Sequence, residues 1–220
     1  MIETRSHLSG TRAQGTIFAV KCLRWRADRP LASEVSNMRK SLMTLTLLAL
    51  GAGSAMAADF SVSIPGMKDG ATVPETMILN GMDCKGGNIS PELTWKGAPA
   101  GTKSFALTLY DPDAPTGSGF WHWAALDIPA TATGLPAGAG DPSKNLLPKG
   151  ARLGNSDLGD ASYAGPCPPV GSGAHRYQFV LHALKTDKLP DLAGKTGALA
   201  GFLVNANEIG RTSFTLKLAR

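Results

Sequence analysis

Cysteine is scarce in this sequence, with three residues in 220, which is too few for a disulfide-dense scaffold. Charged residues make up only 18% of the chain, but a 43% hydrophobic content excludes a disordered protein. Long apolar runs are also missing, because the most apolar stretch is about half of the ~20 residues that a membrane-spanning helix needs. Glycine (26) and proline (15) are plentiful and favour a loop-rich, mainly β fold over a helical bundle.

A basic excess is absent from most of the chain. The formal net charge is +5, but residues 1–57 hold eight of the 22 Lys and Arg and three of the 17 Asp and Glu. The remaining 14 basic and 14 acidic residues cancel, so residues 58–220 are neutral. Because nucleic-acid binding needs a clustered positive surface, we expect this part of the chain to bind no nucleic acid.

Residues 38–57 have the three parts of a secretory signal. Arg39 and Lys40 follow Met38, residues 42–52 are apolar, and small residues end the segment at Ala57. We therefore expect cleavage before Ala58, a periplasmic or secreted product and no stable membrane insertion. Residues 1–37 precede this signal, and we interpret them as an over-extended, unstructured start, with a genuine basic arm as the alternative. Residues 58–220 then form one domain.

Export bears on the two cysteines of that domain, Cys84 and Cys167. An oxidising compartment favours a disulfide between them, and two separate buried thiols are the alternative. A shared metal ion is disfavoured, because the two residues are far apart in the sequence and neither lies in a CxxC motif.

Hydrophobic periodicity predicts most elements of the domain. Apolar alternation indicates strands at residues 76–80, 104–110, 121–128, 175–184 and 213–218. Nearly fifty residues between 128 and 175 show little pattern and are predicted to be a long, functional loop. A helix is predicted over residues 197–209, with Thr196 as its cap, and its expected apolar face consists of Leu199, Phe202, Leu203, Ala206 and Ile209.

Polar side chains gather at the ends of three predicted strands. Asp111 and Asp113 follow the first long strand, His122 lies in the next, and His175 and Tyr177 share one face of the third. Singly, each has a structural explanation, such as a rigid Asp-Pro turn or a packed histidine. Together, two carboxylates, two imidazoles and a phenol can converge on one pocket, in which imidazole and hydroxyl donors bind an anion.

Four motifs in this order resemble the phosphatidylethanolamine-binding protein (PEBP) family, and in particular its bacterial Raf-kinase-inhibitor-like branch. They are Asp-Pro-Asp-Ala-Pro at 111–115, Trp-His at 121–122, Gly-Pro-Cys-Pro-Pro at 165–169 and His-Arg-Tyr at 175–177. Trp121 departs from the pattern, because eukaryotic relatives have a second histidine at its place.

The resemblance implies a mainly β fold: a β-sandwich with a large central sheet, a smaller sheet and one or two peripheral helices. It also implies a small pocket that accepts phosphate, acetate or phospholipid head groups. Carried over by motif, the ligand-binding residues are Asp111, Asp113, Pro115, His122, Pro169, His175 and Tyr177.

The resulting prediction is an exported, non-enzymatic ligand-binding protein that needs no cofactor and no metal. The resemblance implies a kinase or a protease as its protein target and leaves homodimer formation open. The alternative is a metal-assisted hydrolase, because Asp and His side chains can hold a divalent ion that activates water. Residues 58–220 contain no GxSxG motif, which disfavours a serine hydrolase.

The interpretation of the first 57 residues can be tested by N-terminal sequencing of the exported protein. We expect a mature chain that begins at Ala58, because the small residues before it form the cleavage site. An exported chain that keeps residues 1–37 would instead support the basic arm.

Overall fold

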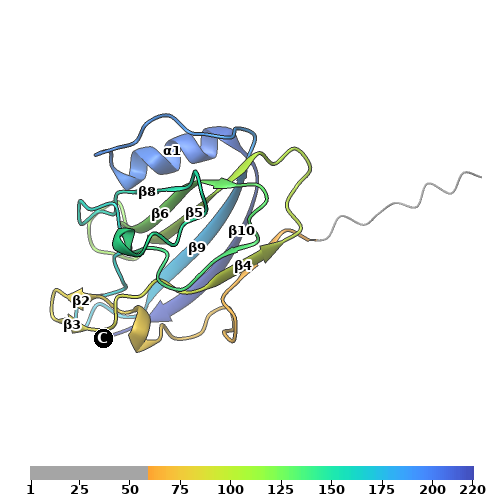
Figure 1. Ribbon diagram of the computed structural model, residues 1–220. Coiled ribbons are helices and arrows are strands. Elements are labelled where there is room, and N and C mark those ends of the chain that lie inside the picture. The colour runs from red at the N-terminus through yellow and green to blue at the C-terminus, as the bar shows by residue number, and fades with distance from the viewer. Residues whose placement is uncertain (1–58) are drawn as a thin grey trace, which may run out of the picture. The chain divides into compact units, whose positions relative to one another are not determined.

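A computed structural model of the protein describes residues 59–220. The predicted start segment, signal segment and cleavage site therefore lie outside the described residues. Five antiparallel strands form the largest sheet, in the order β10-β9-β5-β6-β8 (Figure 1). They are β5 (Ser104–Asp111), β6 (Phe120–Pro129), β8 (Arg152–Gly154), β9 (His175–Leu184) and β10 (Glu208–Leu218).

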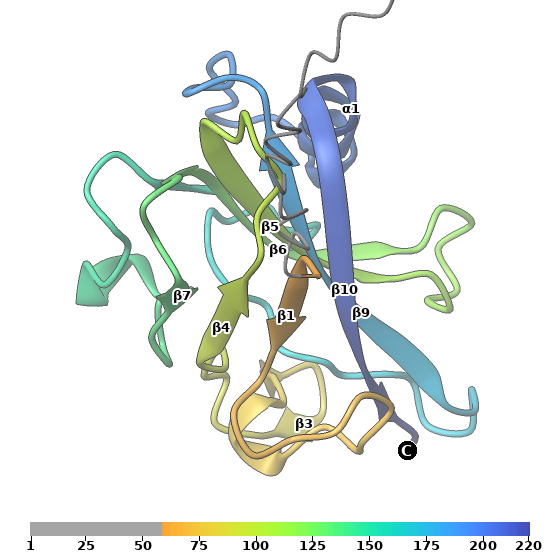
Figure 2. The same ribbon diagram turned by 90° about the vertical axis from the view of Figure 1, so that its right-hand side faces the viewer.

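A second antiparallel sheet consists of β1 (Ser61–Ser63), β4 (Leu93–Lys96) and β7 (Gly134–Leu135). It lies beside the five-stranded sheet as a separate layer (Figure 2). Apolar side chains from both sheets form one large hydrophobic cluster, and two sheets that share a core in this way make a β-sandwich. This arrangement confirms the predicted fold class.

The opposite face of the five-stranded sheet is covered by α1 (Gly197–Asn207) and the loop before it. Because both faces are covered, β5 and β6 are buried along most of their length. The remaining elements are two short 3-10 helices, η1 (Glu75–Met77) and η2 (Pro142–Lys144), and the strand pair β2 (Asn80–Gly81) and β3 (Cys84–Lys85). No helix in residues 59–220 is long and apolar enough to cross a bilayer.

Three of the predicted strands are confirmed, with ends that differ by at most one residue, because long alternating segments carry a strong signal. The last strand begins earlier than predicted, at Glu208, and pairs with β9 through a register shift. The strand predicted at 76–80 is wrong, because a 3-10 turn follows Pro74 and only Asn80 is in a strand. The predicted long loop also contains β7, η2 and β8, which are too short to show a period.

The helix is confirmed, and the Thr196 side chain accepts a hydrogen bond from the Leu199 N–H as its cap. Its predicted apolar face is wrong. Gly197, Ala200, Gly201 and Val204 are buried, whereas Phe202 is 67% exposed.

Trp121 is the reason for this orientation of α1. A Cβ atom at Gly197 or at Gly201 would lie 2.5 or 2.6 Å from the Trp121 side chain, which is closer than real Cβ contacts. The indole on β6 therefore needs a helix face of small residues. Trp121 therefore belongs to the packing of α1.

Cys84 and Cys167 form a disulfide, as predicted. Cross-linking residues 83 positions apart stabilises a fold by about 4 kcal/mol, because it restricts the unfolded chain. The bond ties β3 to the proline-rich segment that precedes β9.

We expect Gly201→Ala to lower the free energy of unfolding by about 1–3 kcal/mol, because the new methyl group overpacks against Trp121. The cost of this overpacking would exceed the gain of about 1 kcal/mol in helix propensity that comes from replacing glycine by alanine. Urea denaturation measures the change. Asn205→Ala, on the exposed side of α1, reports the helix propensity alone. Equal stabilisation by both substitutions would contradict this packing.

Candidate functional site: a cavity at one end of the large sheet

A cavity of about 200 Å³ lies where β5 ends and where β6 and β9 begin. Because β5 is antiparallel to both β6 and β9, the last residues of β5 and the first residues of β6 and β9 lie at the same end of the sheet. Six of the seven predicted ligand-binding residues line this cavity. All of its lining residues are Leu79, Met82, Asp111, Ala114, Pro115, Thr116, Phe120, His122, Leu158, Ala164, Gly165, Cys167, Pro168, Pro169, His175 and Tyr177.

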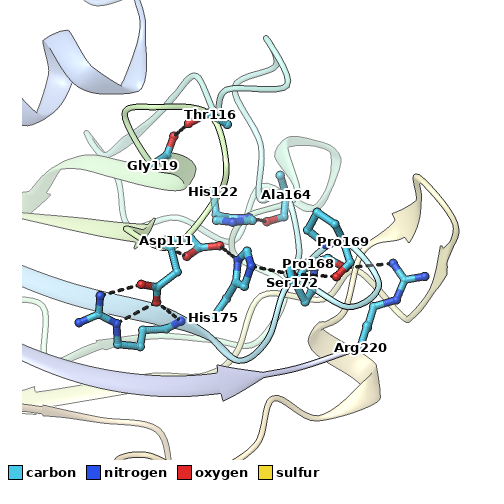
Figure 3. Close-up of polar contacts among 12 residues, drawn as sticks. Asp111, Thr116, Gly119, His122, Ala164, Pro168, Pro169, Ser172, His175 and Arg220 are labelled. Carbon is cyan, nitrogen blue, oxygen red and sulfur yellow. Dashed lines mark hydrogen bonds and ion pairs between the residues drawn. The ribbon is translucent and has the colours of Figure 1, made fainter.

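Asp111 and His175 form a buried pair at the centre of the site (Figure 3). The His175 Nδ1 atom lies 2.7 Å from the Asp111 Oδ2 atom, and both side chains are at most 3% exposed. The other carboxylate oxygen, Oδ1, accepts a hydrogen bond from the Asp113 N–H. The pair thus joins the end of β5 to the start of β9, and a hydrogen-bonded partner is what makes a buried carboxylate tolerable.

Ser172 extends this pair to a third residue. Its Oγ atom lies 2.9 Å from the His175 Nε2 atom and 2.8 Å from the carbonyl oxygen of Pro169. The connectivity is that of a Ser-His-Asp triad, but a hydroxyl has only one proton. A carbonyl oxygen can only accept, so the hydroxyl donates to Pro169 and its oxygen accepts from His175. In this arrangement the Ser172 proton is directed to the Pro169 carbonyl and not to His175.

Asp113 is the one predicted ligand-binding residue that does not line the cavity. It accepts two hydrogen bonds from the Arg176 guanidinium, at 2.7 and 2.8 Å, and one from the Arg176 N–H. The Arg176 side chain holds the pKa of Asp113 at about 2. The pairing of Arg176 with Asp113 carries no signal in the sequence, although Arg176 lies within the His-Arg-Tyr motif. Together, Asp113 and Arg176 fasten the 111–115 turn to β9.

His122 reaches the cavity through a β-bulge. On β5, Leu109 and Tyr110 pair with Trp123 and Trp121, so His122 is an extra residue on β6. Its Nδ1 atom lies 2.7 Å from the carbonyl oxygen of Ala164, so Nδ1 carries a proton. Burial lowers the pKa of His122 to about 4, and the Ala164 carbonyl and the Asp111 charge only partly oppose this. The ring is therefore neutral near pH 7.

The hydroxyl group of Tyr177 is buried and has no hydrogen-bond partner among the described residues. Burial raises the pKa of Tyr177, and the nearby Asp111 and Asp113 charges act in the same direction, so the hydroxyl keeps its proton. Two other buried polar atoms in residues 59–220, on Trp123 and Ser156, also lack partners, but these residues do not line the cavity. Tyr177, a residue that lines the cavity, thus carries a buried donor that no described residue uses.

The proline-rich wall is held from outside by the end of the chain. The Arg220 guanidinium donates to the carbonyl oxygens of Asp83 and Pro168, and the Gly171 N–H donates to the Arg220 carbonyl. Because Cys167 is also bonded to Cys84, this wall is fixed at several points. The sequence analysis missed Arg220, since an arginine beyond the last strand carries no local signal.

Comparison with known proteins identifies the family. A family model described as phosphatidylethanolamine-binding protein matches residues 63–219, which is nearly all of the described part. The chain belongs to the PEBP family.

The UPF0098 protein YbcL of Escherichia coli (strain K12) is 49% identical to this PEBP-family chain over 176 residues, which cover 80% of this chain and 96% of YbcL. The UPF0098 protein YbhB of the same strain is 43% identical over 149 residues, 68% of this chain and 93% of YbhB. The crystal structure of E. coli YbcL, described as a new member of the mammalian PEBP family, matches with a TM-score of 0.72 at 48% identity. That match covers 74% of this chain and 99% of the YbcL structure.

A metal centre has no visible donor set in this part of the protein. Within residues 59–220, no three His, Cys, Asp or Glu side chains are grouped so that they could hold a metal ion. The carboxylates that the alternative, a metal-assisted hydrolase, would use are each engaged elsewhere, Asp111 with His175 and Asp113 with Arg176.

We expect acid to destabilise the fold through His122. Because folding lowers its pKa from 6.5 to about 4, the unfolded chain takes up a proton first as the pH falls. The contribution of His122 to the free energy of unfolding is fully present above pH 6.5, declines between pH 6.5 and 4 and is lost below pH 4. The total loss is about 3 kcal/mol. Urea denaturation at several pH values measures the decline.

The His122→Asn variant is the control, because its amide can still donate to the Ala164 carbonyl but does not titrate. Its pH dependence should be smaller by about the same 3 kcal/mol, whereas the contribution of His182, whose pKa is also lowered by burial, is common to both proteins. An equal decline in the two proteins would contradict the assignment to His122.

Proposed function

We propose that this PEBP-family protein is an exported binding protein whose cavity recognises a small oxyanion, such as phosphate or a phosphorylated head group. The observation that carries the proposal is the Tyr177 hydroxyl, a buried donor without a protein partner on a residue that lines the cavity. A buried polar group without a partner costs about 1–3 kcal/mol. A ligand oxygen that accepts from this hydroxyl would remove that cost, which is a reason for the group to be retained.

The charges around the cavity are compatible with an anion. Asp111 is paired with His175, and Asp113 is paired with Arg176 outside the cavity. Each carboxylate is thus offset by a cationic or hydrogen-bonding partner, and the repulsion that two bare carboxylates would exert is reduced. The bulk charge of the domain is neutral, so recognition would depend on these local groups.

Export is supported by two independent features. Residues 38–57 have the pattern of a secretory signal. The Cys84–Cys167 disulfide suits an oxidising compartment such as the periplasm or the cell exterior.

Modulation of a protein target, as the Raf-kinase-inhibitor-like resemblance implies, is part of the same proposal. Met82 lines the cavity and is 69% exposed, and Val170, next to the wall residue Pro169, is 77% exposed. Exposed apolar side chains beside a binding cavity suit contact with a protein. A target protein of the kinase or protease class would approach here, with an anionic group in the cavity.

The metal-assisted hydrolase is the weaker alternative, because residues 59–220 show no group of three potential metal ligands. The Ser172 hydroxyl is likewise directed to the Pro169 carbonyl, and a serine hydrolase needs that proton to go to the histidine.

Two buried tyrosines, Tyr163 and Tyr177, provide a matched test of the proposal because their hydroxyl groups differ in hydrogen bonding. The Tyr163 hydroxyl donates to the Met77 carbonyl, whereas the Tyr177 hydroxyl has no protein partner. We expect Tyr177→Phe to leave the free energy of unfolding unchanged or slightly raised, and to weaken phosphate binding about tenfold or more, because a charge-assisted hydrogen bond is lost. Calorimetric titration with phosphate and urea denaturation measure the two effects.

Tyr163→Phe is the matched control. It should lower the free energy of unfolding by about 1–2 kcal/mol, because the Met77 carbonyl loses its donor, and it should leave phosphate affinity unchanged. If neither phosphate nor phosphoethanolamine binds the wild-type protein, or if Tyr177→Phe binds phosphate as well as wild type does, the proposed pocket is wrong.

A further inference from the structure

Few side-chain groups in the cavity are free to contact a ligand. Both ring nitrogens of His175 are engaged, with Asp111 and Ser172. Arg176 is bound to Asp113 and lies outside the cavity lining. The ring nitrogen Nε2 of His122 and the hydroxyl of Tyr177 have no hydrogen-bond partner among the described residues. The rings of His122 and Tyr177 are in contact, with centroids 5.3 Å apart.

The two free groups have opposite hydrogen-bonding roles. Tyr177 is protonated and has no acceptor, so it offers a donor. The neutral His122 ring has its proton on Nδ1, where it is committed to the Ala164 carbonyl. Its Nε2 atom therefore carries a lone pair and can only accept. An anion that consists solely of acceptor oxygens would satisfy Tyr177 but would place its own lone pairs against those of His122.

We propose that the cavity selects an oxyanion that keeps a hydroxyl group, namely hydrogen phosphate or a phosphomonoester monoanion, over a phosphodiester. This inference rests on the proposed function. In the selected ligand, a P–O–H group donates to His122 Nε2 while another oxygen accepts from the Tyr177 hydroxyl. A phosphodiester has no such hydrogen and leaves the His122 acceptor unpaired. The intact head group of phosphatidylethanolamine is a diester and falls in the disfavoured class, whereas free phosphoethanolamine is a monoester.

The discrimination is chemical and does not depend on size. A cavity of about 200 Å³ has room for dimethyl phosphate as well as for methyl phosphate. Both are monoanions at pH 5.5 and differ by one methyl group in place of one hydrogen. A site that is built to receive a ligand hydroxyl rejects the analogue without it, because a buried polar group is then left unpaired.

The pH dependence supplies a second signature. The second ionisation of a phosphomonoester has a pKa near 6, so methyl phosphate loses its hydroxyl between pH 5.5 and 8, whereas dimethyl phosphate does not titrate there. The titratable groups around His122 are Asp111 on β5, His175 and Tyr177 on β9, and Asp157 after β8. These protein groups are common to both complexes, so the ratio of the two affinities reports the ionisation of methyl phosphate, which removes its hydroxyl and adds a negative charge.

The experiment is calorimetric titration of the mature protein with inorganic phosphate, methyl phosphate and dimethyl phosphate at pH 5.5 and 8. At pH 5.5 we expect methyl phosphate to bind about tenfold or more tightly than dimethyl phosphate. We expect this ratio to fall about tenfold or more at pH 8, where the hydroxyl is lost. Inorganic phosphate, which also keeps a hydroxyl at pH 5.5, should behave like methyl phosphate there.

Two variants assign the effect to its residues. His122→Asn removes the Nε2 acceptor, keeps a donor for the Ala164 carbonyl and should bring the ratio at pH 5.5 close to one. Tyr177→Phe should weaken both ligands and keep the ratio, because the hydroxyl donates to either. The wild-type ratio and its pH dependence remain a test even if a variant fails to fold.

The outcomes separate this inference from the proposed function. Equal binding of methyl and dimethyl phosphate would overturn the inference and leave the anion pocket in place. A preference that persists unchanged in His122→Asn would also overturn it. If none of the three ligands binds, the proposed anion pocket itself is wrong, and the inference is overturned with it.

Discussion

The buried hydrogen bond between Asp111 and His175 is the interaction on which the arrangement of the cavity depends. It joins the last residue of β5 to the first residue of β9, and Ser172 extends it to the Pro169 wall. A buried carboxylate is costly unless its oxygens are hydrogen-bonded, and here the second carboxylate oxygen has its own donor in Asp113 N–H. The end of β5 and the segment 169–175, which are distant in sequence, therefore have one preferred relative position.

The sequence predicts the frame of the fold well because β5, β6 and β9 are long and strongly patterned. Elements whose form depends on neighbours were less predictable. The buried face of α1 is set by the Trp121 indole, which lies on another element. The 3-10 turn at Glu75–Met77 follows a proline. Residues 76–80, which overlap this turn, hold a short apolar run of the kind found in strands, which led to the wrong prediction. In both places tertiary contacts or turn chemistry override the local period.

The candidate site shows the same division. Motif resemblance led to six residues that line the cavity, because each lies at the end or start of a well-predicted strand. Which of their atoms donate and which accept hydrogen bonds could not be predicted from the sequence. The bulge that turns His122 inward depends on the pairing of β5 with β6, and the partner of its Nδ1 atom is a main-chain carbonyl 42 positions away. Which nitrogen accepts and which donates follows only from these contacts.

Arg220 has a practical consequence for anyone who produces this protein. Its guanidinium and carbonyl groups bind both β2–β3 and the proline-rich wall, and Figure 1 shows the end of the chain beside that hairpin. An affinity tag fused directly after Arg220 adds its bulk next to the cavity wall, and a truncation that removes Arg220 removes these contacts altogether. Ligand-binding measurements are therefore best made with a tag on the other terminus, placed where it can be cut off.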